Sequence, residues 1–132
     1  MKTILLVEDS LNLCALYQEE LGEIGYHTLS VGNGREALEQ MTRHRLDLVV
    51  LDINLPGMDG IEVLERMIEA QPHLPVIINT GFDCYKHSFR LWSATAFVLK
   101  SSDLTELKFQ VQRVLSPQEP DLLLLGRTDG KA

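Results

Sequence analysis

Short runs of apolar residues alternate along the chain with stretches in which apolar residues stand three or four positions apart. Such runs are typical of buried strands, and the spaced stretches are typical of helices with one buried face. Because the two patterns alternate, we predict an α/β domain with a parallel sheet. The apolar runs lie at residues 4–7, 28–31, 46–51, 76–78 and 96–99.

Apolar residues at helical spacing follow four of the five runs, and Tyr85, Phe89 and Trp92 share a helical face after the remaining one. We therefore predict five strands and five helices. Right-handed crossovers between parallel strands would place these helices on both faces of an open sheet. The apolar positions of the five helices are Leu13, Leu16, Tyr17, Leu21 and Ile24; Ala37, Leu38 and Met41; Ile61, Leu64 and Ile68; Tyr85, Phe89 and Trp92; and Leu104, Leu107, Val111 and Val114.

Acidic residues follow two of the predicted strands. Glu8 and Asp9 come directly after the first, and Asp52 comes directly after the third. The carboxyl ends of parallel strands form the ligand-binding edge of such a sheet, so three carboxylates would meet there if the strands are neighbours. Carboxylates this close require a cation, and Mg²⁺ suits a site with few protein ligands. Helix capping is the alternative reading of Asp9, but Asp52 at a matching strand end favours a metal.

Thr80 follows the fourth apolar run, and Lys100 follows the fifth. Taken singly, a threonine here is usually a turn residue and a lysine a solvated charge. Taken with the carboxylates, they place a nucleophile, a hydroxyl donor and a cation around one point. Phosphoryl transfer needs this set, because its transition state spreads negative charge over three oxygens.

The length and composition are those of a single globular domain, and the charge balance limits the kinds of partner that the chain can bind. The 132 residues include 19 acidic and 12 basic side chains, for a formal charge of −7. This balance argues against nucleic-acid or anionic-membrane binding, which need clustered Lys and Arg. The two cysteines, Cys14 and Cys84, have no metal-ligand spacing. The N-terminus does not resemble a signal peptide or a membrane span. We therefore expect a cytoplasmic protein with no direct DNA binding.

Four strings in the sequence resemble the receiver domain of bacterial two-component response regulators, over roughly residues 2 to 116. The string from Asp52 to Gly60, Asp-Ile-Asn-Leu-Pro-Gly-Met-Asp-Gly, is highly specific. The others are Ile4-Leu5-Leu6-Val7-Glu8-Asp9-Ser10, Thr80-Gly81 and Phe97-Val98-Leu99-Lys100. The resemblance implies a flavodoxin-like, doubly wound fold with a five-stranded parallel sheet in the order 2-1-3-4-5.

The resemblance also implies a role for each site residue. Asp52 would take a phosphoryl group from a histidine kinase or histidine phosphotransfer protein. Thr80 and Lys100 would hold the phosphoryl oxygens, and Phe97 would turn inward as Thr80 moves toward the phosphate. The implied Mg²⁺ ligands are Glu8 (through water), Asp9, Asp52 and the backbone carbonyl of Asn54.

The chain departs from the family pattern at residue 101. The family usually has a proline after the lysine that corresponds to Lys100, whereas this chain has Ser101. A cis peptide bond costs about 2.5–4 kcal/mol before a non-proline residue. We therefore expect a trans Lys100–Ser101 bond in place of the family's usual cis bond. We still expect the Lys100 ammonium to pair with Asp52 before phosphorylation.

Three alternatives fit less well. A phosphohydrolase of the haloacid-dehalogenase type needs a second carboxylate two residues after the nucleophile, where this chain has Asn54. A nucleotide- or flavin-binding module needs a phosphate loop after the first strand, and Glu8-Asp9 would repel phosphate. A degenerate receiver, serving only as an interaction module, would have lost part of the site. We expect a signalling domain that assists its own phosphorylation and dephosphorylation, not an enzyme.

The periodic pattern ends near residue 116. We predict a receiver domain over 1–116 and a C-terminal tail or start of a linker over 117–132, with no assigned role for the apolar run 122–125. The output partner is not indicated by the sequence. We expect a monomer or weak homodimer.

Overall fold

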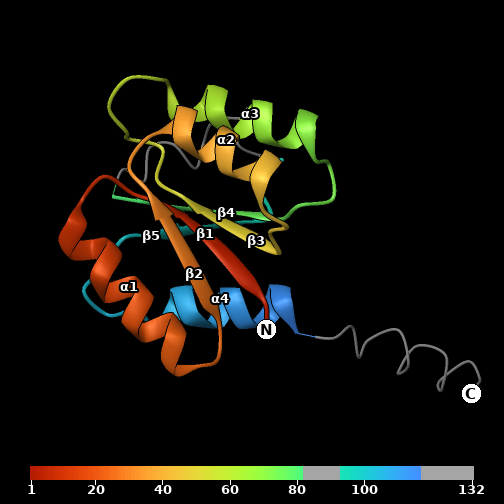
Figure 1. The fold of residues 1–132 in the computed structure, drawn as a ribbon. Coiled ribbons are helices and arrows are strands. Elements are labelled where there is room, and N and C mark those ends of the chain that lie inside the picture. The colour runs from red at the N-terminus through yellow and green to blue at the C-terminus, as the bar shows by residue number, and fades with distance from the viewer. Residues whose placement is uncertain (82–92, 117–132) are drawn as a thin grey trace, which may run out of the picture.

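The computed structural model describes residues 1–81 and 93–116, and these residues form a three-layer α/β arrangement (Figure 1). The strands are β1 (Thr3–Val7), β2 (His27–Val31), β3 (Leu48–Leu51), β4 (Val76–Thr80) and β5 (Ala96–Leu99). The helices are α1 (Leu11–Glu23), α2 (Gly34–Arg43), α3 (Gly60–Ala70) and α4 (Thr105–Leu115). The last of these is the fifth predicted helix. The fourth, predicted from Tyr85, Phe89 and Trp92, lies outside the described residues.

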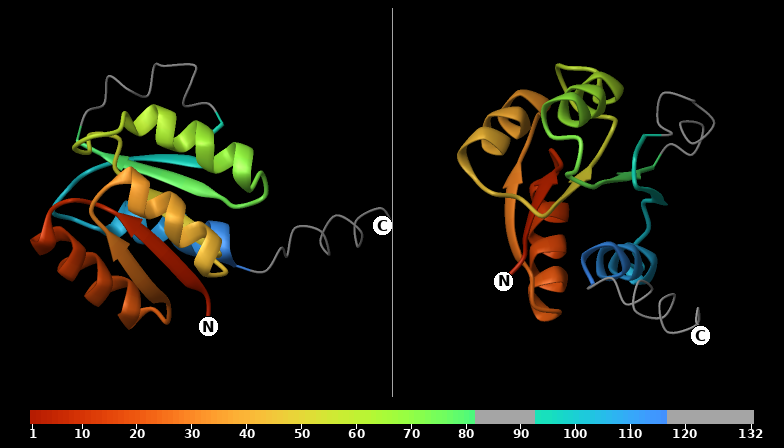
Figure 2. Two further views of the ribbon diagram at one scale, coloured as in Figure 1. Left: turned by 45° about the horizontal axis from the view of Figure 1, so that its top comes forward. Right: turned by 90° about the vertical axis from the view of Figure 1, so that its right-hand side faces the viewer.

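All strand pairs are parallel, and the sheet order is β2-β1-β3-β4-β5. This confirms the order that the sequence resemblance implied. Helices α2 and α3 cover one face, and α1 and α4 cover the other, as Figures 1 and 2 show. No helix in the described part of the chain is long and apolar enough to cross a membrane.

The central strands are apolar on successive residues because helices cover both of their sides. In β1, Leu5 and Val7 pack in the cluster beneath α2 and α3, whereas Ile4 and Leu6 pack in the cluster beneath α1 and α4. All four side chains are at most 1% exposed. Two hydrophobic cores therefore hold β1 and β3 rigidly in the middle of the sheet.

Polar side chains define the starts of three helices. The Ser10, Asn33 and Asp59 side chains accept hydrogen bonds from the backbone N–H groups of Leu13, Glu36 and Ile61, respectively. Each bond satisfies an N–H group that has no partner within its own helix. Ser10 and Asp59 thereby set where the chain turns from the ends of β1 and β3 into α1 and α3.

Four strands differ from the apolar runs by one or two residues at one end. β1 and β2 each begin one residue earlier, β3 begins at Leu48 and not at residue 46, and β4 continues past the apolar run 76–78 to Thr80. Just before β3, the Asp47 carboxylate accepts a hydrogen bond from the Thr3 N–H at 2.8 Å, and the Asp47 N–H donates to the Thr3 carbonyl at 2.8 Å. The extension of β4 makes Thr80 a strand residue, so its side chain has a defined face of the sheet.

Candidate functional site

The predicted site residues meet at one edge of the sheet because they end four of its strands. Val7 pairs with Leu51, and Thr80 pairs with Leu99. The Asp52 N–H donates to the Val7 carbonyl at 3.0 Å, and the Lys100 N–H donates to the Thr80 carbonyl at 2.8 Å. The strand register therefore brings together residues that lie far apart in the sequence.

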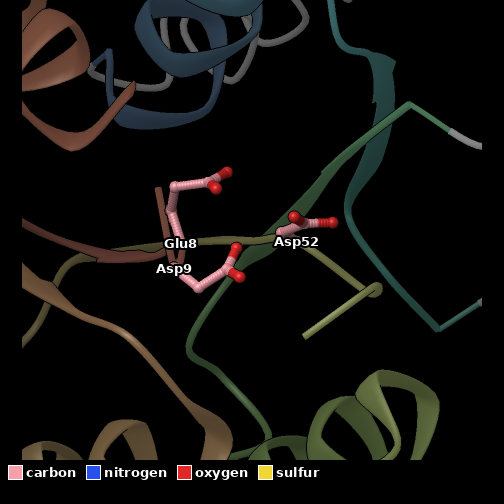
Figure 3. A group of neighbouring side chains, drawn as sticks. All are labelled: Glu8, Asp9 and Asp52. Atoms are coloured by element: carbon pink, nitrogen blue, oxygen red, sulfur yellow. The ribbon is translucent and has the colours of Figure 1, made fainter. Parts of the chain in front are cut away.

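Three carboxylates form a compact acidic cluster at this edge. Oxygens of Glu8, Asp9 and Asp52 all lie within 4.8 Å of one another. Figure 3 shows Glu8 and Asp9 at the end of β1, beside Asp52 at the end of β3. Glu8 and Asp52 are buried, at 4% and 5% exposure, while Asp9 is exposed. Oxygen ligands with one side open to water are the donor set that Mg²⁺ prefers, so these residues fit the predicted ion.

Lys100 places one positive charge beside two of the three carboxylates. Its Nζ lies 2.9 Å from Asp52 Oδ2 and 2.7 Å from Glu8 Oε1. Burial by itself would lower the pKa of Lys100, but the hydrogen bonds and charges of Glu8 and Asp52 outweigh burial, and the pKa is raised. The ammonium therefore stays charged. The expected pairing with Asp52 is confirmed, and the Lys100–Ser101 peptide bond is trans, as predicted.

Backbone N–H groups orient the two buried carboxylates. The Asn54 N–H donates to Asp52 Oδ1 at 3.0 Å, and the Ser10 N–H donates to Glu8 Oε2 at 3.0 Å. Hydrogen bonds of this kind to a charged acceptor are stronger than neutral ones. Asp52 is thus held in a single orientation by β3, by the loop that follows it and by Lys100.

The Thr80 hydroxyl, at the end of β4, has no hydrogen-bond partner among the described residues. Its side chain is fully buried, and Oγ1 is unsatisfied. A buried hydroxyl without a partner costs about 1–3 kcal/mol and calls for an explanation. The described residues leave this hydroxyl able to bond to a further group.

Phe97 lies on β5 opposite Ile78 of β4, while Thr80 lies opposite Leu99. Because side chains alternate along a strand, Phe97 and Thr80 point to the same face of the sheet. Phe97 is half-buried and packs against the hydrophobic cluster on the α2–α3 side. This placement is compatible with the predicted pair.

One polar contact beside the site was not foreseen from the sequence. The Asn79 side-chain amide donates to the Tyr17 hydroxyl at 3.1 Å, and both residues are buried. The available signal was a polar residue, Asn79, directly after the apolar run 76–78 and within β4. Tyr17 gave no sequence signal of a polar contact, because an aromatic residue on the buried face of a helix is ordinarily a core residue.

Comparisons with known proteins agree with this geometry. The family model described as the response regulator receiver domain matches residues 4–112. Sporulation initiation phosphotransferase F of Bacillus subtilis is 38% identical over 115 residues, which cover 85% of this chain and 92% of that protein. The transcriptional regulatory protein ZraR of Escherichia coli K12 is 30% identical, but the alignment covers 86% of this chain and only 26% of that longer protein.

Solved structures show the same similarity. The response regulator protein TrrA of Thermotoga maritima, in complex with Mg²⁺-BeF, is 37% identical with a TM-score of 0.84, and the match covers 87% of this chain and all (100%) of that one. A crystal structure of histidine kinase ThkA in complex with TrrA matches at 38% identity with a TM-score of 0.83, over 88% of this chain and 100% of that one.

Proposed function

The chain belongs to the response regulator receiver domain family, and on that premise we propose that Asp52 is its phosphoacceptor. Such a domain is a phosphoacceptor switch of two-component signalling. The observation that carries the assignment is the setting of Asp52. Its carboxylate follows the central strand, lies in the acidic cluster and pairs with Lys100 at 2.9 Å.

The proposed reaction moves a phosphoryl group from a histidine to Asp52. An Asp52 oxygen forms a bond to phosphorus while the bond from phosphorus to the donor nitrogen breaks, and that nitrogen keeps the electron pair. In this proposal Lys100 and Thr80 bind the phosphoryl oxygens. Thr80 ends β4, which neighbours β3, and Lys100 directly follows β5, which neighbours β4. Charge neutralisation and positioning of this kind supply most of the catalysis of phosphoryl transfer.

Mg²⁺ would be held by Asp9, Asp52 and the Asn54 carbonyl, with Glu8 acting through water, and would neutralise charge on the transferred group. The acidic cluster supports this ion, as does the neighbouring structure of TrrA with Mg²⁺-BeF. Glu8 and Asp52 each already accept a backbone N–H. The protein thus keeps the ligands oriented before the ion arrives.

We propose a histidine kinase or histidine phosphotransfer protein as the phosphodonor, supported by the complex of ThkA with TrrA. We further propose that Thr80 and Phe97 couple phosphorylation to the partner-binding surface, and that the domain assists its own phosphorylation and dephosphorylation. Residues 1–116 would be the receiver and 117–132 a tail or linker. A cytoplasmic, monomeric or weakly dimeric protein that acts through protein contacts fits this role.

Intact-mass measurement after incubation with acetyl phosphate tests the phosphoacceptor. We expect one added phosphoryl group with Mg²⁺ and little or none in EDTA. Asp52→Asn should remove it. Asp47→Asn is the matched control, because Asp47 lies at the opposite edge of the sheet and an amide oxygen can still accept the Thr3 N–H. Phosphorylation of the Asp52→Asn protein would refute the assignment.

A further inference from the structure

Among the described residues, four polar side chains are buried: Glu8, Asp52, Asn79 and Thr80. Phosphoryl transfer accounts for three of them. Asn79, at 3% exposure, has no part in that chemistry, although it immediately precedes Thr80. Burying an amide group costs free energy unless it is hydrogen-bonded, so a buried asparagine beside a site needs a reason.

Asn79 points away from the phosphoryl site, toward the layer of α1 and α4. Side chains alternate along β4: Ile78 packs in the core beneath α2 and α3, and Ile77 packs in the core that contains Tyr17. Asn79 shares the face of Ile77. There its amide donates to the Tyr17 hydroxyl at 3.1 Å. A rigid helix is therefore hydrogen-bonded to the strand residue next to Thr80.

The same helix is tied to the acidic side of the site. α1 begins directly after Asp9 and Ser10, and the Ser10 N–H donates to the Glu8 carboxylate. One turn before Tyr17, the Cys14 thiol donates to the Glu8 backbone carbonyl at 3.3 Å. The buried face of α1 thus contacts the end of β1 through Cys14 and the end of β4 through Tyr17.

The Tyr17 phenol lies within electrostatic reach of the site. Burial is the main cause of its raised pKa, which the hydrogen bond from Asn79 and the charge of Lys100 oppose, while the charges of Glu8 and Asp52 add to it. The charges of Lys100, Glu8 and Asp52 therefore act on the Tyr17 hydroxyl.

We propose that Tyr17 and Asn79 are positioning residues for phosphoryl transfer at Asp52. Their hydrogen bond holds the end of β4 against α1 and so places the Thr80 hydroxyl relative to the acidic cluster. It also places Lys100, whose backbone N–H donates to the Thr80 carbonyl at 2.8 Å. Neither residue touches the reacting atoms. The inference rests on the proposed function of Asp52.

Two apolar side chains of similar shape could fill the space of Tyr17 and Asn79. What the hydrogen bond adds is a fixed relative orientation of the two residues. Replacing both partners of a buried hydrogen bond by apolar groups is often nearly neutral for stability, whereas removing one partner leaves the other unpaired. Hydrophobic contact is non-directional, while a hydrogen bond requires one geometry. A double variant can therefore separate a contribution to stability from a contribution to positioning.

The test compares Tyr17→Phe, Asn79→Leu and the Tyr17→Phe/Asn79→Leu double variant with the wild-type chain. Tyr26→Phe is the matched control, because Tyr26 is half-buried and packs against the same core as Tyr17. Each protein is unfolded in urea. Each is then phosphorylated with increasing acetyl phosphate at saturating Mg²⁺, which gives a maximal rate and a half-saturating donor concentration.

We expect each single variant to lower the maximal rate at least about threefold without changing the half-saturating concentration, because positioning acts on the transition state. The double variant should regain stability but keep the low rate, and Tyr26→Phe should match wild type. A wild-type rate in folded Tyr17→Phe, or recovery of the rate together with stability in the double variant, would overturn the proposal. If Tyr17→Phe does not fold, the double variant decides.

A second readout does not depend on phosphorylation. The methyl resonance of Thr80 in the metal-free, unphosphorylated protein should shift in Tyr17→Phe and the double variant but not in Tyr26→Phe. If the wild-type chain failed to take phosphate on Asp52, the proposed function would fail while this signal still tested the positioning. An unmoved Thr80 resonance with normal phosphorylation would refute the positioning alone.

Discussion

At the scale of single residues, Lys100 dominates the unphosphorylated site. Its ammonium contacts two buried carboxylates, while its own side chain is 21% exposed. Removing the ammonium group would leave the Glu8 and Asp52 carboxylates buried without their cationic partner. Breaking one side of a buried charged contact typically costs more than the intact pair contributes. Lys100 thus stabilises the fold as well as preparing the site.

The raised pKa of Lys100 predicts how that stability depends on pH. A group whose pKa is higher in the folded protein contributes fully below its unfolded value, which is 10.5 for this lysine, and the contribution is lost as pH rises through the folded value. In EDTA, Lys100→Met should lower the free energy of unfolding by about 1–3 kcal/mol near neutral pH. The difference from wild type should shrink at more alkaline pH.

Urea unfolding at a series of pH values measures this difference. Lys108→Met is the matched control, because Lys108 pairs with Glu20 between two partly exposed side chains, and such a pair contributes little. A Lys100→Met difference that stays constant well above the unfolded pKa would contradict the ion-pair account.

At the scale of elements, the close approach of α3 to the loop after β3 shapes the site. A Cβ atom on Gly60, the first residue of α3, would lie 2.1 Å from the Ile53 carbonyl oxygen. That oxygen is backbone, so it moves only if the loop moves. The loop includes Asn54, whose N–H orients Asp52. Gly60 therefore links the packing of α3 to the geometry of the phosphoacceptor.

We predict that Gly60→Ala destabilises the domain by about 1–3 kcal/mol, as overpacking does, and slows phosphorylation. Gly22→Ala is the control within α1, because its Cβ would meet nothing within 4 Å. It should be neutral or stabilise by about 0.4–1 kcal/mol through the unfolded state. Urea unfolding and the acetyl phosphate assay measure both effects. Equal behaviour of the two variants would show that the short Gly60 contact is unimportant.

The paired strands β4 and β5 support a coupling between Thr80 and Phe97. Both side chains point to one face of the sheet. Among the described residues, Thr80 Oγ1 has no hydrogen-bond partner, so it can bond to a new group. Phosphorylation adds charge that can bias an element with two arrangements. We predict that Thr80→Ala abolishes most beryllofluoride-induced amide shifts on β5 and α4. The predicted fourth helix, also part of this surface in our hypothesis, lies outside the described residues.

Two-dimensional NMR of the wild type and Thr80→Ala, each with beryllofluoride and Mg²⁺, tests the coupling. Thr80→Ser is the control, because it keeps the hydroxyl and should retain the shifts. Unchanged shifts in Thr80→Ala would remove Thr80 from the switch.

At the scale of the whole molecule, the net charge limits the partners. The formal charge of −7 opposes approach to a polyanion, because nucleic-acid binding depends on neutralising phosphates with Lys and Arg. We predict no specific DNA binding by this chain. A gel shift at submicromolar protein that weakened with salt would contradict this prediction.

The sequence by itself determined the architecture and indicated which residues gather at one edge of the sheet. Alternating apolar runs and helical spacing indicated the five strands, and the receiver motif indicated their order. Asp9, Asp52, Thr80 and Lys100 were predicted as site residues because each lies within two residues of the end of an apolar run, and parallel strands end at one edge. These properties are local, so residue order alone carries them.

Only the tertiary structure decided which distant side chains form ion pairs and hydrogen bonds with one another. Lys100 pairs with Glu8 as well as Asp52, and Tyr17 bonds Asn79 across 62 positions of sequence. The Asp47 carboxylate likewise accepts a hydrogen bond from the Thr3 N–H, 44 positions away. Hydrogen bonds need their two atoms within about 3 Å in a defined direction. Whether distant residues meet that condition depends on strand register and helix packing, which no local pattern specifies.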